Sequence, residues 1–391
     1  MKRQLLRTLV ALRDLLPERI SGGLRAKRFR YTPRDVPPVP RTVGGEVRLY
    51  IAQANFAGQG YRWARAAESL PGVVAANLML LRAPARFSSD FTVPLTVSRA
   101  SSRWQKKHFA SIVGGTTHVL IEASRPIFGA LFEGDLRREV AALQEGGIRV
   151  GMISHGSEVR LPSRHAAAHP FSPFHVMEPS QVSSMEQVAR SNQKLLSELG
   201  VPTFVSTPAL MIEQPEATWL PVAIDTSEWS SAHVPLVREV PVVVHAPSRE
   251  VIKRSDLIDA ALSKLDGEGL ISYRRIAGLP NSEIPAIFAD ADVLVDAVGT
   301  GNYGVAACEG MASGCVVVSY VDPQVARFVR SETGRDLPIV HTEPDQLEDT
   351  IRRVLGDRKR YQDLAADGLS FVAEFHDGAR SAAALCSFLA T

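Results

Sequence analysis

Short hydrophobic runs alternate with longer amphipathic segments along the first half of the chain. The runs whose apolar and β-branched residues predict buried strands lie at 47–52, 118–122, 148–154 and 203–206. The segments whose apolar positions recur at helical spacing lie at 133–144 and 183–199. Strands that alternate with helices in this way are typical of a parallel sheet with crossover helices, so residues 42–212 predict one α/β domain.

The same alternation begins again after residue 240. Strand-like runs lie at 241–245, 272–276, 293–296 and 316–320, with helical patterns between them at 256–264, 283–289 and 304–312. Residues 213–375 therefore predict a second α/β domain, and the whole pattern predicts two doubly wound, Rossmann-like domains. A C-terminal helix is expected at 376–391. One interpretation is that this helix packs back on the N-terminal domain.

The first 41 residues differ from the rest of the chain in charge. Residues 1–41 hold eleven Lys or Arg and three Asp or Glu, whereas the net charge of the whole chain is only +2. Apolar residues recur at helical spacing from Leu5 to Ile20, but charges interrupt every apolar run. The pattern predicts a basic amphipathic helix followed by a proline-rich linker at 31–40, and not a membrane span. Two interpretations stay open: contact with an anionic membrane, or packing on the helix's own domain.

Length and composition are those of a two-domain enzyme without disulfide bonds. A chain of 391 residues exceeds the size at which one hydrophobic core keeps growing, and 45% hydrophobic with 22% charged residues excludes disordered and fibrous classes. The three cysteines, Cys308, Cys315 and Cys386, are odd in number and form no CxxC pair. Neither a disulfide framework nor a cysteine zinc site is therefore expected, and a reducing cytoplasm fits best.

Ligands of open α/β sheets bind beyond the carboxyl ends of the strands, so the loops there are the candidate sites. The loop after strand 47–52 contains Gly58 and Gly60, which permit close approach of a ligand to the backbone. Trp63 stands where a third glycine would complete a dinucleotide-binding motif, which disfavours an NAD enzyme. An ordinary tight turn is the alternative explanation of this loop.

The loop after strand 148–154 carries a compact polar cluster of His155, Glu158 and Arg160. An imidazole, a carboxylate and a guanidinium at the end of one strand are hard to explain as core packing, although His155 alone is more often structural. The cluster predicts a site that faces substrate.

Cations gather in the loop after the first strand of the second domain. Arg249, Lys253 and Arg254 lie near the start of a predicted helix, where free backbone N–H groups also favour negative charge. Such a loop is suited to a diphosphate, and a solvated basic turn is the alternative.

The most specific segment follows strand 293–296 and contains a glycine loop, a helix start and a carboxylate in that order. Gly304 would let a phosphate reach the first N–H groups of the helix, and Glu309 could accept two hydrogen bonds from ribose hydroxyls. The donor-site residues expected here are Asp296, Asn302, Tyr303, Gly304, Val305 and Glu309. The alternative is a helix that only packs, with Glu309 in solvent.

These stretches together resemble the retaining nucleotide-sugar glycosyltransferases of the group one family, which are family 4-like and adopt the GT-B fold with two domains facing a central cleft. The resemblance covers most of residues 46–380. It implies that Arg249 and Lys253 bind the donor diphosphate, that Glu309 binds the ribose, and that His155 lies beside the transferred sugar. By the same resemblance, the second domain would hold the donor and the first the acceptor. Arg254 stands where the family usually has glycine and is expected to point into solvent. It further implies transfer with retention, stabilised at the leaving phosphate without a metal, a cofactor or a covalent nucleophile.

One departure from the family pattern concerns a glutamate. The family usually has a pair of glutamates seven residues apart; the second aligns with Glu309, but the first position is Gly301 here. The missing carboxylate supports one rival interpretation, a noncatalytic partner that binds sugar nucleotides. A nucleotide-sugar epimerase or phosphorylase on the same plan is the other rival, because a fold does not fix chemistry.

The expected partners are a nucleotide-sugar donor and a glycan or lipid-linked acceptor, as in glycan, glycolipid or cell-surface polysaccharide synthesis. No contact with nucleic acid is expected. The expected location is the cytoplasm, with peripheral contact to the inner membrane face through residues 1–41 as an option.

Overall fold

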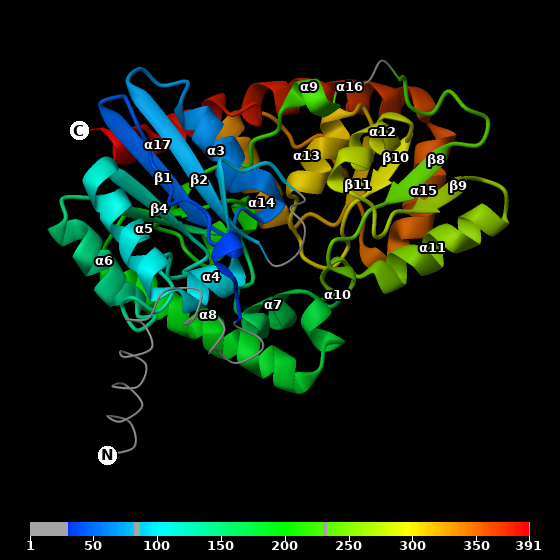
Figure 1. The fold of residues 1–391 in the computed structure, drawn as a ribbon. Coiled ribbons are helices and arrows are strands. Elements are labelled where there is room, and N and C mark those ends of the chain that lie inside the picture. The colour runs from blue at the N-terminus through cyan, green and yellow to red at the C-terminus, as the bar shows by residue number, and fades with distance from the viewer. Residues whose placement is uncertain (1–29, 82–86, 230–232, 391) are drawn as a thin grey trace. The chain divides into compact units, whose positions relative to one another are not determined.

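The computed structural model describes residues 30–81, 87–229 and 233–390 (Figure 1). By their contacts these residues form two compact units. Residues up to 153, with 195–203 and 385–390, make the first unit, and residues 154–194 and 204–384 make the second. The units are not the expected domains, because segment 154–194 groups with the second unit; the boundaries at 42–212 and 213–375 stay predictions. The expected amphipathic helix lies almost wholly outside the described residues.

The first unit contains five parallel strands in the order β3-β2-β1-β4-β5. The strands are β1 (Val47–Gln53), β2 (Val73–Leu81), β3 (Phe91–Pro94), β4 (His118–Glu122) and β5 (Arg149–Ser154). The helices that connect them are α3 (Gln59–Ala67), α4 (Leu95–Ala100), α5 (Ser102–Gly115) and α6 (Leu136–Glu145). Strand β1 pairs with β2 on one side and with β4 on the other. Nearly all of its side chains are buried, as expected for a strand inside a parallel sheet.

Local sequence signals set the helix starts of this unit. Helix α5 begins after Ser101, whose hydroxyl accepts a hydrogen bond of 3.1 Å from the Trp104 N–H, and α6 begins after Asp135, which caps Arg137 in the same way at 2.9 Å. The end of the C-terminal helix α17 (Ala379–Leu389) also belongs here. Its Phe388 ring packs edge-on against His118, with ring centroids 5.2 Å apart.

The second unit holds a five-stranded parallel sheet in the order β12-β11-β10-β8-β9. Its strands are β8 (Val242–His245), β9 (Ser272–Arg275), β10 (Val293–Val295), β11 (Val316–Ser319) and β12 (Val340–His341). The connecting and flanking helices are α10 (Glu250–Lys253), α11 (Ser255–Gly267), α12 (Ile284–Ala289), α13 (Val305–Ala312), α14 (Pro323–Thr333), α15 (Leu347–Gly356) and α16 (Arg358–Phe375). Because β10 pairs with both β8 and β11, the loops after these strands emerge at one edge of the sheet.

Further elements lie along the chain before this sheet. They are α7 (Pro162–Ala168), α8 (Pro179–Leu199), the parallel pair β6 (Thr203–Val205) and β7 (Thr218–Trp219), and α9 (Thr226–Trp229).

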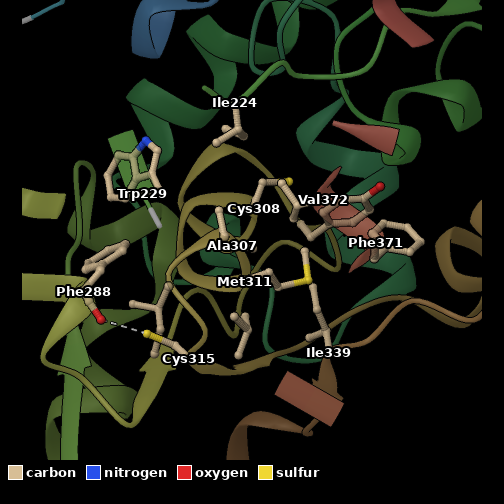
Figure 2. Close-up of a cluster of buried hydrophobic side chains, with 14 of the residues drawn as sticks. Ile224, Trp229, Phe288, Ala307, Cys308, Met311, Cys315, Ile339, Phe371 and Val372 are labelled. Atoms are coloured by element: carbon tan, nitrogen blue, oxygen red, sulfur yellow. Dashed lines mark hydrogen bonds between the residues drawn. The ribbon is translucent and has the colours of Figure 1, made fainter. Parts of the chain in front are cut away.

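One face of the second sheet is covered by a core in which α13 is central. Its Ala307, Cys308 and Met311 are buried with Phe371 and Val372 of α16 (Figure 2). Burial raises the pKa of the Cys308 thiol well above its usual value. The thiol is therefore a packing group and not an activated nucleophile.

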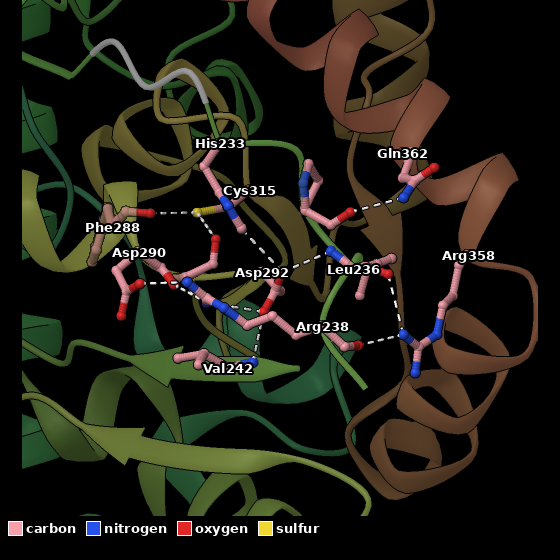
Figure 3. A network of polar contacts seen from close by, with 12 residues as sticks. His233, Leu236, Arg238, Val242, Phe288, Asp290, Asp292, Cys315, Arg358 and Gln362 are labelled. Atoms are coloured by element: carbon pink, nitrogen blue, oxygen red, sulfur yellow. Dashed lines mark hydrogen bonds and ion pairs between the residues drawn. The ribbon is translucent and has the colours of Figure 1, made fainter. Parts of the chain in front are cut away.

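A buried carboxylate fixes the chain where it enters the second sheet. Asp292, just before β10, is fully buried and accepts hydrogen bonds from the backbone N–H groups of Leu236 at 2.6 Å and Val242 at 2.7 Å. His233 Nε2 lies 3.0 Å from the same carboxylate, and the Arg238 guanidinium lies between Asp292 and Asp290 (Figure 3). The segment that precedes β8 is thus anchored at its C-terminal end.

The fold class expected from the sequence, α/β with two parallel sheets and alternating helices, is confirmed. Among the described residues, no helix combines the length and the apolar character needed to cross a membrane.

Candidate functional site

The glycine loop of the first unit is organised by a buried carboxylate at the end of β4. Glu122 accepts hydrogen bonds from the backbone N–H groups of Ala54 at 2.8 Å and Asn55 at 2.9 Å. Gly60 lies against it, since a Cβ at this position would lie 3.2 Å from both carboxylate oxygens. Gly58 precedes α3 with φ +75°, a conformation that favours glycine. Both glycines therefore have a structural reason, and their predicted contact with the donor stays a prediction.

The polar loop after β5 is held by hydrogen bonds within the loop. The Glu158 carboxylate accepts hydrogen bonds from the backbone N–H groups of His155 and, at 3.1 Å, Gly156. The carboxylate thus holds the turn that carries the His155 side chain. Burial lowers the pKa of Arg160, Glu213 and Glu158 raise it, and Arg249 lowers it by charge repulsion.

The loop after β8 and the loop after β10 are joined by an ion pair. Lys253 Nζ lies 2.6 Å from Asp296 Oδ1, with side chains only 14% and 6% exposed, and it also donates to the Ala246 carbonyl at 3.3 Å. Arg249 is exposed, and its Nη1 lies 3.5 Å from the Ser157 hydroxyl. Arg249, Lys253 and Asp296, which are predicted to bind the donor, therefore belong to the same unit.

Arg254 does not point into solvent as the sequence suggests. Its side chain is buried, pairs with Asp256 at 2.8 Å, and donates from Nη1 to the Phe171 carbonyl at 3.0 Å. Its backbone is left-handed, with φ 56°, at the junction of α10 and α11, and a Cβ on Gly299 would lie 2.6 Å from its Cγ. The expectation was wrong because the left-handed turn and the absence of a side chain at Gly299 make room for the arginine inside the unit.

The start of α13 matches the expected phosphate site in part. Gly304 precedes the helix, and no atom lies within 4 Å of the position that a Cβ would take there. Val305 opens the helix and Glu309 lies one turn later, both half-buried. Asn302 Oδ1 accepts from the Ala209 N–H at 3.4 Å. Tyr303, in contrast, is 1% exposed, so its side chain belongs to the core and only its backbone is available to a ligand.

The position of the missing glutamate is closely packed. Gly301 has φ +64°, and a Cβ there would lie 3.2 Å from Asp322 Cβ and 3.3 Å from both the His169 and Tyr320 rings. A side chain at 301 is thus disfavoured by the left-handed backbone conformation and would require small shifts of three neighbours. His165 Nε2 lies 3.3 Å from the Thr300 carbonyl and supports the same loop.

Sequence reasoning missed the histidines around this loop. His169 Nδ1 lies 3.0 Å from the Tyr320 hydroxyl and its Nε2 lies 3.6 Å from Asp322, while its ring stacks obliquely on His165 at 4.4 Å. Burial lowers the pKa of His165 to about 3, so this imidazole is neutral near pH 7. The only signal in the sequence was the spacing of four residues between His165, inside α7, and His169, which directly follows the end of that helix.

A small cavity of about 70 Å³ adjoins these histidines. Its polar lining residues are Arg160, Arg164, His165, His169, Glu213, Thr300, Asp322 and Gln324. Arg160, predicted to lie near the acceptor or the sugar, is thus brought close to the Gly301 loop. His155 is not among the lining residues.

A third missed histidine, His245, supports the basic loop. His245, the last residue of β8, is buried, with Nδ1 2.8 Å from the Val295 carbonyl and Nε2 2.8 Å from the Ser255 hydroxyl. Burial lowers its pKa to about 4, and the nearby Lys253 acts in the same direction. The neutral ring ties β8, β10 and the start of α11 together, which fixes the loops that carry the Lys253–Asp296 pair.

Comparison with known proteins places the fold. No protein-family model and no curated protein sequence matches this chain. A sucrose-phosphate synthase from Thermosynechococcus elongatus is 11% identical and superposes over 87% of this chain and 97% of its own, with a TM-score of 0.58. HepE from Anabaena in complex with UDP is 11% identical over 88% of this chain and 99% of its own, with a TM-score of 0.54. The UDP-glucose complex of HepE is 10% identical over 88% and 98%, with a TM-score of 0.52.

These structural neighbours are GT-B proteins, and at this identity the likeness concerns the fold alone. The GT-B fold class inferred from the resemblance is therefore confirmed. The assignment of individual residues to donor, sugar and acceptor stays a prediction.

Proposed function

We propose that the protein transfers a sugar from a nucleotide-diphosphate donor to an acceptor hydroxyl. The observation that carries the proposal is the Lys253–Asp296 pair, which joins two neighbouring loops at the carboxyl edge of the second sheet. Arg249 is exposed in one of these loops, and the open N-terminus of α13 ends the other. Cations beside free helix N–H groups are the groups that stabilise a diphosphate. The complexes of the structural neighbour HepE with UDP and UDP-glucose support the same class of ligand.

The proposed chemistry depends on charge at the leaving group. As the bond between sugar and phosphate breaks, negative charge grows on the diphosphate, where Arg249, Lys253 and the N–H groups near Gly304 can stabilise it. Glu309 accepts hydrogen bonds from the ribose. The acceptor hydroxyl enters on the face that the diphosphate leaves, which gives retention without a metal or a covalent nucleophile.

The proposed sugar-binding group is His155, held by the Glu158 carboxylate beneath its loop. Arg160, beside the cavity next to Gly301, is proposed to contact the sugar or the acceptor. Asp296 is proposed to orient Lys253 and to contact the donor through its second oxygen.

The proposed acceptor is a glycan or a lipid-linked sugar in cell-surface polysaccharide or glycolipid synthesis. The reaction would take place in the cytoplasm, with residues 1–41 in peripheral contact with an anionic membrane. This assignment is supported by the charge excess of that segment.

Thermal-shift measurements with UDP, GDP, ADP and TDP sugars test the donor class. A donor at one hundred times its dissociation constant adds about 2.7 kcal/mol to the unfolding free energy, so one base should stand out. The same donor is then incubated with candidate acceptors, and nucleotide diphosphate release is measured with and without each. Acceptor-dependent release supports the proposal. An isomerised nucleotide sugar without release indicates an epimerase, and binding without any turnover indicates a noncatalytic partner.

Two variants test the division of roles. Glu309→Ala should weaken binding of the free nucleotide diphosphate, whereas His155→Ala should leave that affinity nearly unchanged and lower turnover. Equal losses of nucleotide affinity in both variants would contradict the proposed roles.

A further inference from the structure

An open groove in the first unit is lined by none of the residues assigned to the donor. It has a volume of about 1030 Å³ and runs between the extended segment 36–43 and helix α5. Two hydrogen bonds hold the segment along the helix: the Trp104 indole N–H donates to the Pro37 carbonyl at 3.0 Å, and the Ser111 hydroxyl donates to the Pro40 carbonyl at 2.7 Å. Because both donors come from α5, the groove has fixed walls.

The walls of the groove are largely apolar. Its apolar lining residues are Val36, Pro37, Pro38, Val39, Val43, Phe91, Trp104 and Ala110. Val43, four residues before β1, is 79% exposed. An apolar groove of this size suits a hydrocarbon chain better than a sugar, which needs several polar partners.

The charged residues of the groove all have the same sign. Arg41, Arg103 and Lys107 line it and are exposed, and no Asp or Glu is among the lining residues. Within residues 30–81, 87–229 and 233–390, none of the three forms an ion pair with a carboxylate, in contrast to Arg137, which pairs with Glu198. Arg103 and Lys107 are four residues apart on α5 and share one face. The groove therefore combines an apolar interior with an unneutralised basic margin.

Charge decides between the candidate occupants. Residues 1–29 of the same chain carry eight Lys or Arg and two Asp or Glu, so their docking would bring like charges together. A second copy of the groove would do the same. An anionic amphiphile satisfies both properties, since its head group neutralises the margin and its chain covers the apolar walls.

We propose that this groove binds an anionic phospholipid, with the head-group phosphate at Arg41, Arg103 and Lys107 and an acyl chain along Val36, Val39 and Val43, beside the buried Trp104. The site uses no residue of the proposed donor site. Val36, Val39 and Arg41 belong to the segment 1–41, so the proposal rests on the proposed membrane contact and names the lipid and the site for it. Its success or failure is independent of sugar transfer.

The first test measures binding of the full chain to vesicles of phosphatidylcholine with and without phosphatidylglycerol. Lys107→Glu and Lys106→Glu each reverse one exposed charge at adjacent positions of α5, and only Lys107 lines the groove. Lys107→Glu should weaken binding more than Lys106→Glu. The double variant Arg103→Glu/Lys107→Glu should weaken binding at least about tenfold, because each basic residue near an anionic surface adds to the attraction. Equal losses at positions 106 and 107 would reduce the effect to general surface charge and overturn the proposal.

The second test uses the fluorescence of Trp104, because residues 1–29 could hold the chain on a vesicle by themselves. Phosphatidylglycerol with brominated acyl chains should quench the protein's tryptophan emission, and Trp104→Phe or Arg103→Glu/Lys107→Glu should remove most of that quenching. Quenching that is equal in all variants, or equal with brominated phosphatidylcholine, would overturn the proposal. Reversal of the quenching by millimolar inorganic phosphate alone would indicate a phosphate site and not a lipid groove.

Discussion

Lys253 has two separable roles at the scale of single residues, because it neutralises the nearly buried Asp296 and faces the proposed leaving group. Lys253→Ala should lower kcat about a hundredfold, as loss of one donor to a developing anion does. It should also lower the unfolding free energy by about 1–3 kcal/mol, because the Asp296 carboxylate is left without its cation. Turnover assays and urea denaturation measure the two effects.

The double variant Lys253→Ala/Asp296→Asn separates these roles. Removing the unpaired charge should restore most of the lost stability, while turnover should stay low. Recovery of both would show that Lys253 acts only by supporting the fold. Arg254→Ala is not a suitable control, because that side chain is buried. Arg327 is exposed, and Arg327→Ala serves as the control.

Two glycines of one loop offer a matched pair. Gly301→Ala should lower the unfolding free energy by about 1–3 kcal/mol, since φ is +64° and three neighbours stand within 3.3 Å of the new Cβ. Gly304→Ala should change stability little, because its φ is −148° and nothing lies within 4 Å. Its effect should appear in donor affinity instead. Equal destabilisation by both would mean that the packing around His169 does not constrain the loop.

Glu139 sets a pH dependence at the scale of elements. It lies in the first turn of α6, and its carboxylate accepts from the backbone N–H groups of Ile127 at 2.6 Å and Phe128 at 3.2 Å. Burial raises its pKa from 4.5 to about 7. The folded protein therefore binds this proton more tightly than the unfolded chain. The stabilisation is complete below pH 4.5 and is lost as the pH rises through about 7.

Between pH 5 and pH 8 this group alone should lower the unfolding free energy by up to about 3 kcal/mol. Glu139→Gln should flatten that slope in urea denaturation, whereas Glu145→Gln, exposed on the same helix, should leave it unchanged. A slope that survives in Glu139→Gln would assign the dependence to other groups.

The elements that could be predicted from the sequence are those with an unambiguous period. The short apolar runs of β1, β8 and β10 predict these strands within a residue or two. Strand β2 was not, because Val73–Leu81 is rich in Ala, Leu and Met, which favour helices, and only its pairing with β1 makes it a strand.

The candidate site likewise has parts that local sequence patterns predict and parts that depend on tertiary packing. Loops after strands locate Lys253, Asp296 and Gly304 from sequence order alone, because parallel topology brings strand ends together. The burial of Arg254 and Tyr303, and the histidines around Gly301, depend on packing between segments that are 73 to 151 residues apart, for which no local pattern exists.

At the scale of the whole chain, the Asp292 anchor should control the segment before β8. The two carboxylate oxygens of Asp292 accept hydrogen bonds from two backbone N–H groups, those of Leu236 and Val242. In Asp292→Asn an amide NH₂ group takes the place of one of these oxygens, so one backbone N–H loses its acceptor. The substitution should therefore lower the unfolding free energy by about 1–3 kcal/mol and speed proteolysis near residues 233–241. Asp290→Asn removes only half-exposed pairs with Arg238 and Arg274 and should change stability by less than about 1 kcal/mol. Equal proteolysis rates in both would place the anchor elsewhere.

The placement of Phe388 in the first unit has a consequence for synthesis on the ribosome. A Cβ on Gly151 would lie 3.2 Å from the Phe388 ring, and the same ring covers His118, so β4 and β5 share a partner that is translated more than 230 residues after them. While the second unit emerges, this part of the nascent first unit exposes apolar surface of the kind that chaperones bind. The N-terminal unit of this protein therefore completes its packing last, although it is translated first.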